Sequence, residues 1–317
     1  MSSNILIVGC GNIGSRHLQS LERSLTPLSI TVIEPNMNSQ KIAKSQLEKN
    51  SKNSISWFSS ISELNHIFDL AIITTNAEQR KSIVDTLLES GNKKFLLEKM
   101  VCQSQNDYED LIKNFNKHNA SGWVNTNRRY FPFYQTLKNL INFNDNLKIS
   151  ITAGNNGLGS NAIHFIDIFL WLKNSSDISL NGDLTDKLYP NKRGNQYYEF
   201  SGTILGEISN SFLKISFSPV NNLPLILDIE TQNFHISINE TDEKILKIKN
   251  LKKFELSFKY LHVSDLTLQI VSDILKNNYS HLPKIQDLFI AHCELFKIFN
   301  SHVKKLTNKE LTICPIT

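Results

Sequence analysis

The sequence predicts an α/β protein: a doubly wound parallel sheet, followed by an α+β domain with a large, open and mainly antiparallel sheet. Two observations predict this architecture. Up to about residue 122, short apolar runs typical of buried parallel strands alternate with stretches of helical periodicity. After residue 123, most apolar runs alternate with polar residues, as in antiparallel strands with one solvated face. A chain of 317 residues is long enough for two domains, which we place at residues 1–122 and 123–317.

Four apolar runs predict the strands of the first sheet, and helical stripes separate them. The predicted strands are residues 5–8, 30–33, 70–73 and 95–97. Apolar residues at helical spacing predict helices after the first and third of these runs, and over residues 108–115. The helix after the third run stops at Gly91, a residue type that often ends helices.

The second domain is expected to combine helices with alternating strands. The predicted strands are residues 148–152, 197–204, 212–217, 225–229 and 234–238. The predicted helices are residues 133–141, 161–172, 266–276 and 285–304. The second of these helices is almost entirely apolar, so we expect it to be buried. An open sheet of this kind often pairs with another subunit, and a homodimer or homotetramer is the expected assembly.

The composition argues against nucleic-acid and membrane partners. The chain has 34 Lys and Arg against 30 Asp and Glu, and the lysines are scattered instead of forming the basic stripe of a nucleic-acid protein. No apolar run approaches the roughly 20 residues of a membrane-spanning helix. The first apolar run is too short for the core of a secretion signal. We therefore expect a cytoplasmic protein.

Cysteine and histidine spacing predicts neither a disulfide framework nor a metal site. The four cysteines are far apart in the sequence: Cys10, Cys102, Cys293 and Cys314. No pair has the CxxC spacing of metal sites, and the nine histidines form no HxxxH or HExxH pattern. Reduced thiols and no bound metal are the expectation.

A glycine-rich segment joins the first predicted strand to the first predicted helix. Residues 9–14 read Gly-Cys-Gly-Asn-Ile-Gly, the GxGxxG pattern on which a Rossmann domain binds a dinucleotide. The glycines allow a tight turn, a close approach of backbone to pyrophosphate, and close packing of helix on strand. The alternative is an ordinary glycine turn. The residues that we expect to contact the cofactor here are Gly9, Gly11, Asn12, Ile13 and Gly14.

An acidic residue stands where such a domain binds the ribose of its cofactor. Glu34 ends the second predicted strand, 20 residues after Gly14, and a carboxylate there can accept hydrogen bonds from the ribose hydroxyls. It would repel a 2′-phosphate, and the next residues, Pro35 and Asn36, supply no cation to receive one. NAD is therefore favoured over NADP as the cofactor. The alternative is that Glu34 is a solvated strand end.

Two more polar segments follow predicted strands, at the sheet edge where doubly wound proteins bind ligands. They are Thr74-Thr75-Asn76 and Glu98-Lys99, and we expect all five residues to contact the cofactor. A lysine held at a strand end beside a nicotinamide can have a lowered pKa and act in proton transfer. Taken alone, Lys99 fits an exposed lysine better, since most lysines are exposed.

Together these segments resemble the Gfo/Idh/MocA family, named for glucose–fructose oxidoreductase, inositol dehydrogenase and a rhizopine-catabolism protein. The matching pieces are the glycine loop with Arg16-His17 after it, Thr74-Thr75-Asn76, residues 95–99, Asn127-Arg128-Arg129 and residues 164–167. The resemblance covers residues 4–132 and 150–173. It implies that Lys99 contacts the reacting hydroxyl and the nicotinamide ribose. Arg80 stands where the family often has a histidine.

One predicted helix carries a polar stripe on an otherwise apolar surface. The stripe consists of Ser160, Asn161, His164 and Asp167. A spacing of three or four residues places them on one face, where they need polar partners or a wet cleft. From the residues alone, His164 fits a structural histidine as well as a catalytic one. The resemblance implies that His164 is the general acid/base on the substrate hydroxyl and that Asp167 orients it or binds substrate.

The sequence departs from the family pattern where substrate is expected. Ser160 replaces the family's Asp four residues before the histidine, so one carboxylate is missing. A Gly/Asn-rich run, residues 154–159, can surround a polyhydroxylated ligand with amides. Arg129 can hold a carboxylate or phosphate, or can instead form a salt bridge. The residues that we expect to bind substrate are Asn127, Arg129, Asn156, Ser160, Asn161 and Asp167.

The resemblance implies an NAD-dependent dehydrogenase of a sugar, cyclitol or sugar derivative, and an activated or acidic sugar of surface-glycan synthesis is our expectation. Lys99 and His164 manage the hydroxyl proton while a hydride passes to the nicotinamide. Two alternatives keep the cofactor. One is an enzyme that retains NAD and uses transient oxidation for epimerisation, elimination or glycosidic cleavage. The other is a non-catalytic sensor of NADH or a sugar-nucleotide.

Overall fold

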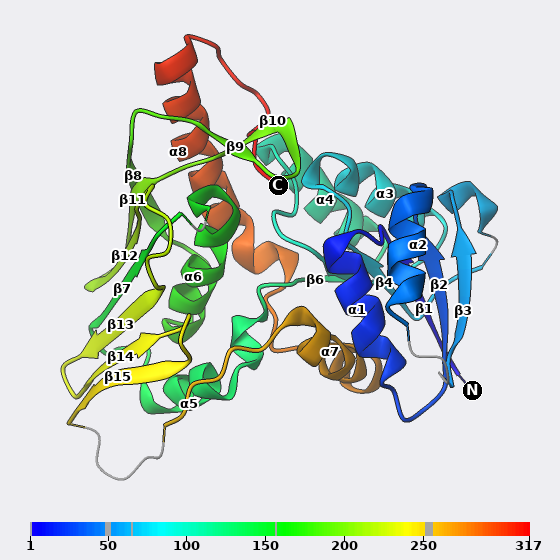
Figure 1. Ribbon diagram of the computed structural model, residues 1–317, viewed down its shortest axis with the longest axis horizontal. Helices are drawn as coiled ribbons and strands as arrows, with labels where there is room; N and C mark the ends of the chain where they lie inside the picture. Colours follow the sequence, from blue (N-terminus) through cyan, green and yellow to red (C-terminus); the bar gives the residue numbers. More distant parts are fainter. Residues whose placement is uncertain (1, 48–51, 65, 156, 251–255) are drawn as a thin grey trace. The chain divides into compact units, whose positions relative to one another are not determined.

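The computed structural model of the chain describes residues 2–47, 52–64, 66–155, 157–250 and 256–317 (Figure 1). It divides into two compact units. The first comprises Met1–Cys102, Asn106–Asn127 and Leu261–Ile285, and the second comprises Gln103–Gln105, Arg128–Tyr260 and Gln286–Thr317. The first unit is therefore discontinuous, because a segment that the sequence placed in the second domain packs with the N-terminal part of the chain.

A six-stranded parallel sheet forms the centre of the first unit, as predicted. Its order, β3-β2-β1-β4-β5-β6, reverses between β1 and β4 and is that of a doubly wound Rossmann sheet. The strands are β1 (Ser3–Val8), β2 (Leu28–Ile33), β3 (Ser54–Phe58), β4 (Leu70–Ile73), β5 (Lys94–Leu97) and β6 (Ser121–Val124). All four residues of β4 are fully buried, which explains its unbroken apolar sequence.

The two outermost strands of this sheet were not predicted. The edge strand β3 is half-exposed and has the sequence Ser-Ile-Ser-Trp-Phe, and β6 has only four residues, one of them a glycine. Neither sequence carries the continuous apolar run of a central strand, so periodicity alone does not identify them.

Helices of the first unit flank its sheet. They are α1 (Asn12–Glu22), α2 (Met37–Ser45), the 3₁₀ turn η1 (Ile61–Glu63), α3 (Ala77–Glu89), α4 (Gln105–Lys117) and α7 (Val263–Asn277). Helix α7, far along the chain, lies beside α1 (Figure 1). The amide of Leu268 donates to Ser20 Oγ (3.0 Å), and the carbonyl of Ile285 accepts from the Tyr108 hydroxyl (2.8 Å). These bonds fasten the returning segment to the first unit.

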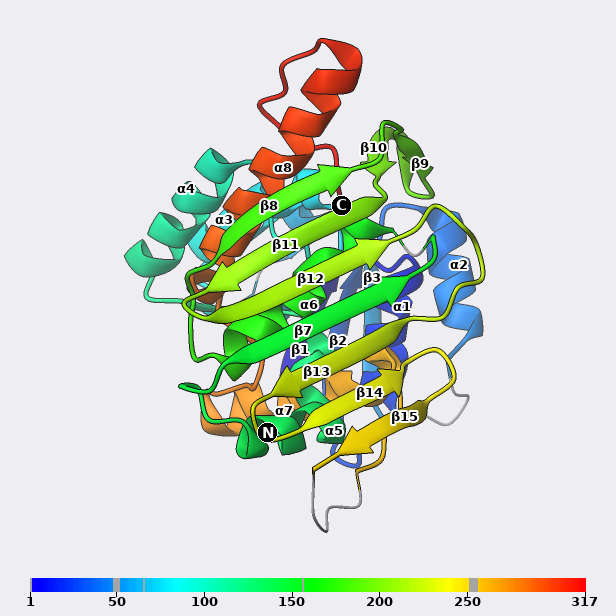
Figure 2. The ribbon, with the colours of Figure 1, turned by 90° about the vertical axis from the view of Figure 1, so that its left-hand side faces the viewer.

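A seven-stranded sheet forms the second unit, in the order β15-β14-β13-β7-β12-β11-β8 (Figure 2). Among the described strands of this sheet, only the β7–β12 pair is parallel, so the mainly antiparallel prediction is confirmed. The strands are β7 (Leu147–Ala153), β8 (Ser179–Leu184), β11 (Gly202–Ile208), β12 (Ser211–Phe217), β13 (Ile226–Thr231), β14 (His235–Asn239) and β15 (Lys244–Lys249).

A separate hairpin precedes β11. It pairs β9 (Tyr189–Asn191) with β10 (Gly194–Glu199). The single strand predicted over residues 197–204 was wrong, because β10 ends at Glu199 and the chain changes direction before β11. Gly202 makes the change with a φ of +126°.

The helices of the second unit include one that is buried along most of its length. They are η2 (Asn127–Tyr130), α5 (Pro132–Leu140), α6 (Leu158–Leu172), η3 (Ile285–Leu288) and α8 (Phe289–Thr307). Helix α6 packs against β12 and β11, which confirms the burial predicted from its composition. No helix in the described part of the chain combines the length and apolar character needed to cross a membrane.

Candidate functional site

The glycine loop joins β1 to α1 and has little room for side chains. Gly9 has a φ of +86°, in the left-handed region that favours glycine. A Cβ on Gly14 would lie 2.1 Å from the Gly9 carbonyl oxygen. A Cβ on Gly11 would instead meet no atom of the described residues within 4 Å, and no side chain caps α1 there. Open space beside uncapped helix amides fits the pyrophosphate of a dinucleotide.

The Glu34 carboxylate lies beside this loop, directly after β2. Glu34 is buried, its Oε2 accepts a hydrogen bond from the Cys10 amide (2.6 Å), and its Oε1 accepts one from the Asn36 amide (2.9 Å). An ionised carboxylate offers about four lone-pair positions, so about two remain for ribose hydroxyls. The arrangement fits a ribose without a 2′-phosphate.

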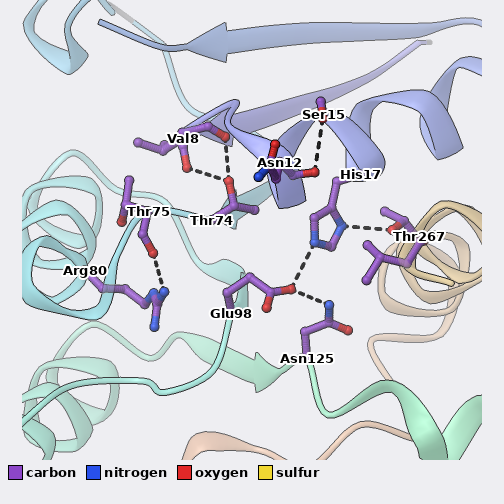
Figure 3. Close-up of polar contacts among 12 residues, drawn as sticks. Val8, Asn12, Ser15, His17, Thr74, Thr75, Arg80, Glu98, Asn125 and Thr267 are labelled. Atoms are coloured by element: carbon purple, nitrogen blue, oxygen red, sulfur yellow. Dashed lines mark hydrogen bonds and ion pairs between the residues drawn. The ribbon is translucent and has the colours of Figure 1, made fainter. Parts of the chain in front are cut away.

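Two threonines follow β4, and Thr74 contacts the glycine loop (Figure 3). The Thr74 hydroxyl lies 2.5 Å from the Gly9 carbonyl oxygen and 3.1 Å from that of Val8, and it can donate to either. Among the described residues, the buried Thr75 hydroxyl oxygen has no hydrogen-bond partner, which fits a group completed by a bound cofactor. The buried Arg80 guanidinium donates to the carbonyls of Thr75 and Met100, so it ties together the segments after β4 and β5.

Glu98 belongs to a buried polar network at the end of β5 (Figure 3). Its Oε1 accepts a hydrogen bond from Asn125 Nδ2 (2.5 Å) and lies 3.2 Å from His17 Nε2. The other ring nitrogen of His17 lies 2.8 Å from Thr267 Oγ1 on α7. Burial by itself raises the pKa of the Glu98 carboxyl, but the hydrogen bond and charge of His17 and the Asn125 bond outweigh it and lower that pKa to about 2. Glu98 is therefore an ionised structural anchor.

Lys99 follows Glu98 and is also buried, at 9% exposure. The peptide bond between Lys99 and Met100 is cis. Burial removes the alternative of an ordinary exposed lysine, because the side chain is held in the interior beside the Glu98 network. Asn12 and Ile13 open helix α1, and Asn76 is the N-cap residue of α3. The first unit thus gathers the predicted cofactor residues at the carboxyl ends of β1, β2, β4 and β5, and together they fit NAD.

In the second unit, helix α6 carries the predicted polar stripe. His164 and Asp167 are both buried on it. Arg129 forms a two-pronged salt bridge with Asp167, with Nη2–Oδ1 and Nε–Oδ2 distances of 2.6 and 3.0 Å, and its guanidinium lies 5.6 Å from the Trp171 ring. Of the two roles expected for Arg129, the structure therefore shows the salt bridge. An anion that reached Arg129 would compete with Asp167.

Ser160 contacts a carboxylate that the sequence did not point to. Both its hydroxyl and its amide donate to Glu199, the last residue of β10, the amide over 3.2 Å. Asn161, beside it, donates from Nδ2 to the Gly157 carbonyl (3.1 Å), and Asn127 is buried in η2. Asn156, the remaining predicted substrate residue, lies outside the described residues.

Sequence reasoning missed the roles of several buried polar groups. His17 and Arg80 entered only as family matches or departures, and Glu199 did not enter at all. A second pair, Arg128 with Glu240, is buried with an Nη2–Oε2 distance of 2.7 Å, and the charge of Glu240 raises the pKa of Arg128 despite the burial. The partners of these buried polar residues lie far away in the sequence, so the spacing of residues does not indicate the contacts.

The cysteine thiols are buried. All four are described and lie outside any disulfide. Burial, and next the charge of Glu34, raises the pKa of Cys10 to about 12, so this thiol in the glycine loop stays protonated. Within the described residues, no group of three His, Cys, Asp or Glu is placed to hold a metal ion.

Comparison with protein families identifies the first unit. Residues 3–126 match the GFO_IDH_MocA family model, described as an oxidoreductase family with an NAD-binding Rossmann fold. No curated protein sequence matches the chain.

Solved structures share the whole fold at low identity. A dehydrogenase (MviM) from Clostridium difficile has 20% identity and a TM-score of 0.70, over 95% of this chain and 100% of that one. The WlbA dehydrogenase from Bordetella pertussis, solved with NADH and UDP-GlcNAcA, has 13% identity and a TM-score of 0.67, over 100% and 99%. A super-repressor mutant of Gal80p from Saccharomyces cerevisiae has 15% identity and a TM-score of 0.69, over 96% and 97%. Residues 3–126 are thus similar to the Gfo/Idh/MocA family of NAD-binding oxidoreductases, and the solved structures share the fold of the chain.

Proposed function

We propose that the chain is an NAD-dependent oxidoreductase that moves a hydride between nicotinamide and a hydroxyl-bearing carbon of a sugar, cyclitol or sugar derivative. The observation that carries the proposal is the buried Lys99, fixed directly after Glu98 at the edge where the glycine loop and Glu34 fit NAD. The WlbA dehydrogenase, which was solved with NADH and a sugar-nucleotide, supports the choice of substrate class.

Each residue has a task in this reaction. NAD, when bound, supplies the site that accepts or donates the hydride. The loop amides bind its pyrophosphate, and Glu34 accepts from its adenosine ribose. Lys99 contacts the reacting hydroxyl, and His164 takes up or returns the hydroxyl proton as general acid/base. Lys99 belongs to the first unit and His164 to the second.

The test is a nicotinamide-absorbance assay with NAD and fractionated sugars, sugar acids and nucleotide-sugars. We expect one fraction to reduce NAD with the native protein, and the rate to fall at least about 100-fold in Lys99→Ala, the usual range for loss of a proton-transfer group. Lys93→Ala removes an exposed lysine just before β5 and serves as the matched control. Equal rates in native and Lys99→Ala proteins would contradict the proposed role.

A second candidate is a sensor or a cofactor-retaining enzyme with no net redox change. Two observations favour it: position 160 is a serine where the family has a carboxylate, and the same fold occurs in the super-repressor mutant of Gal80p. Such a protein would release tightly bound NAD on denaturation and reduce none of it in the assay. Mass analysis of the incubated sugars separates the two, because a sensor leaves them unchanged.

We also propose a cytoplasmic homodimer or homotetramer that associates through the open sheet of the second unit. On this face Lys148 lies between Phe212, which is 48% exposed, and Glu230 on the neighbouring strands. Apolar and oppositely charged side chains together suit a self-complementary interface. Light scattering at micromolar concentration should give a multiple of 36.2 kDa, and the mass of one chain would refute the assembly.

A further inference from the structure

A polar cavity of about 570 Å³ lies within the second unit, and we call it the α6 pocket. Four parts of the chain line it: residues 155 and 157 before α6, the first turn of α6, the β9–β10 hairpin, and Asn221 between β12 and β13. Two of the predicted substrate residues, Ser160 and Asn161, are among its walls. The cavity is large enough for a small sugar.

Glu199 lines the α6 pocket, and hydrogen bonds hold its carboxylate in position. Oε1 accepts from the Ser160 hydroxyl and from Asn191 Nδ2 (3.0 Å), and Oε2 accepts from the Ser160 amide (3.2 Å). A Cβ on Gly157 would lie 2.9 Å from the carboxylate carbon, and one on Gly159 would lie 3.1 Å from Oε2. The two glycines therefore leave the space that this carboxylate occupies.

This arrangement supplies a carboxylate beside position 160 although the residue there is a serine. It comes from Glu199, which is 39 residues further along the chain. Carboxylates are strong acceptors for the hydroxyl groups of a ligand.

Cations and amides complete the walls. Lys192 and Arg193 form the exposed turn between β9 and β10, and neither makes an ion pair within the described residues. The side-chain Nδ2 of Asn155 donates to Oδ1 of Asn221, another residue of the lining (3.2 Å). Two unpaired cations beside amides and a single carboxylate form a surface for a ligand that is both polyhydroxylated and anionic.

We propose that the α6 pocket binds a sugar with an anionic substituent, a carboxylate or a phosphate. Lys192 and Arg193 contact the anion, and Glu199 accepts hydrogen bonds from the hydroxyls. Arg129 is not the anion contact, because Asp167 already engages its guanidinium. The inference rests on the proposed function only in identifying this sugar with the substrate.

The test is calorimetric titration of the NAD-loaded protein with glucuronate, glucose 6-phosphate and glucose. We expect at least one of the two anions to bind about tenfold or more tightly than glucose, and the preference to weaken at high salt. The double variant Lys192→Ala/Arg193→Ala should remove this preference and leave glucose binding unchanged. Lys244→Ala/Lys249→Ala, two exposed lysines of β15, makes the same change in net charge and is the control.

Glu199→Gln keeps the shape of the side chain and removes its charge. We expect it to weaken all three sugars by a similar factor of about three to ten, since it affects the hydroxyls and not the anion. A thermal unfolding scan shows whether this variant still folds, and the hairpin variants, changed only at exposed positions, keep the test decisive if it does not.

The outcomes separate this inference from the proposed function. Glucuronate binding alone identifies a carboxylate, glucose 6-phosphate alone a phosphate, and either supports the pocket. Equal binding of anionic and neutral sugars, or a preference that survives the double variant, overturns it. If NAD is reduced by a neutral sugar while neither anion binds, the pocket assignment fails and the dehydrogenase stands. If anions bind through Lys192 and Arg193 but no sugar reduces NAD, the pocket assignment stands and the dehydrogenase assignment fails.

Discussion

Gly14 and Gly11 both belong to the glycine loop, but a methyl group added at Gly14 would disturb the fold, whereas one added at Gly11 would disturb only cofactor binding. Gly14→Ala would place a carbon 2.1 Å from the Gly9 carbonyl, so we expect both a lower unfolding temperature and a loss of NADH binding. Gly11→Ala meets no described protein atom within 4 Å, so only the approach of the cofactor should suffer. Thermal unfolding and NADH fluorescence titration of both variants measure the two effects separately.

Each of the two glycine variants has a result that would contradict the role given to its glycine. An unchanged NADH affinity in Gly11→Ala would contradict the placement of the pyrophosphate over this loop, and a native unfolding temperature in Gly14→Ala would contradict the close packing.

The charge of Glu34 decides between the two nicotinamide cofactors. We expect the native protein to bind NADH at least about tenfold tighter than NADPH, because the carboxylate repels a 2′-phosphate in a buried position. Glu34→Gln should reduce this preference, since the charge is lost while one acceptor oxygen remains. Titration with both cofactors measures it, and Glu89→Gln, an exposed acid at the end of α3, is the control. Tighter binding of NADPH to the native protein would overturn the assignment.

Glu98 should make the protein sensitive to acid. Its pKa of about 2 in the folded protein lies below the ordinary value of 4.5, so its ionised form stabilises the fold. This contribution, about 3 kcal/mol, is fully present above pH 4.5 and is lost as the pH falls toward 2. Urea unfolding between pH 7 and pH 2.5 measures the loss, and the free energy of unfolding of Glu98→Gln should depend less steeply on pH. Parallel curves for the two proteins would show that Glu98 is not the group responsible.

Among the elements, helix α6 depends on a residue outside it. Gly157, its N-cap, has a φ of +75° and offers no side-chain cap, so the Glu199 carboxylate takes that place. Gly157→Ala combines backbone strain with a clash against Glu199, and we expect it to lower the free energy of unfolding by more than about 1 kcal/mol. In the double variant with Glu199→Ala the clash is relieved, and the backbone strain and the loss of the Glu199 cap remain. Chemical unfolding of the three proteins measures the difference.

Elements with one dominant local signal were predictable from sequence, and those held by distant partners were not. Residues 70–73 were assigned as a strand with the observed bounds of β4, because four consecutive apolar residues suit only a buried position. The strand β10 was placed wrongly, because its polar residues carry no alternation.

The same distinction applies to the site. The glycine loop and Glu34 follow a local pattern that requires only strand, turn and helix in order. Glu199 reaches Ser160 from another strand, and His17 reaches Thr267 across 250 residues. Only the fold brings such residues together, and no spacing rule connects them.

For the whole molecule, the discontinuous first unit predicts how fragments behave. A fragment of residues 1–127 lacks α7, whose Leu266, Ile270 and Ile274 are buried, so we expect it to bind no NADH and to be rapidly proteolysed. Joining residues 261–285 to it through a flexible Gly/Ser linker should restore folding and NADH binding. NADH titration and limited proteolysis compare the two chains. Native affinity in the shorter fragment would show that α7 is dispensable.

The packing of α7 with the first unit also affects when this unit can fold during synthesis of the chain. A ribosome adds about 5 to 20 residues per second, so on the order of ten to thirty seconds pass between synthesis of residue 127 and synthesis of residue 285. During that interval the part of the first unit up to residue 127 exposes to solvent the surface that α7 later covers. The strands of the second unit are synthesised in the same period. The first unit is thus complete only once residue 285 has been made, the second unit follows with residues 286–317, and the chain becomes able to bind NAD only near the end of translation.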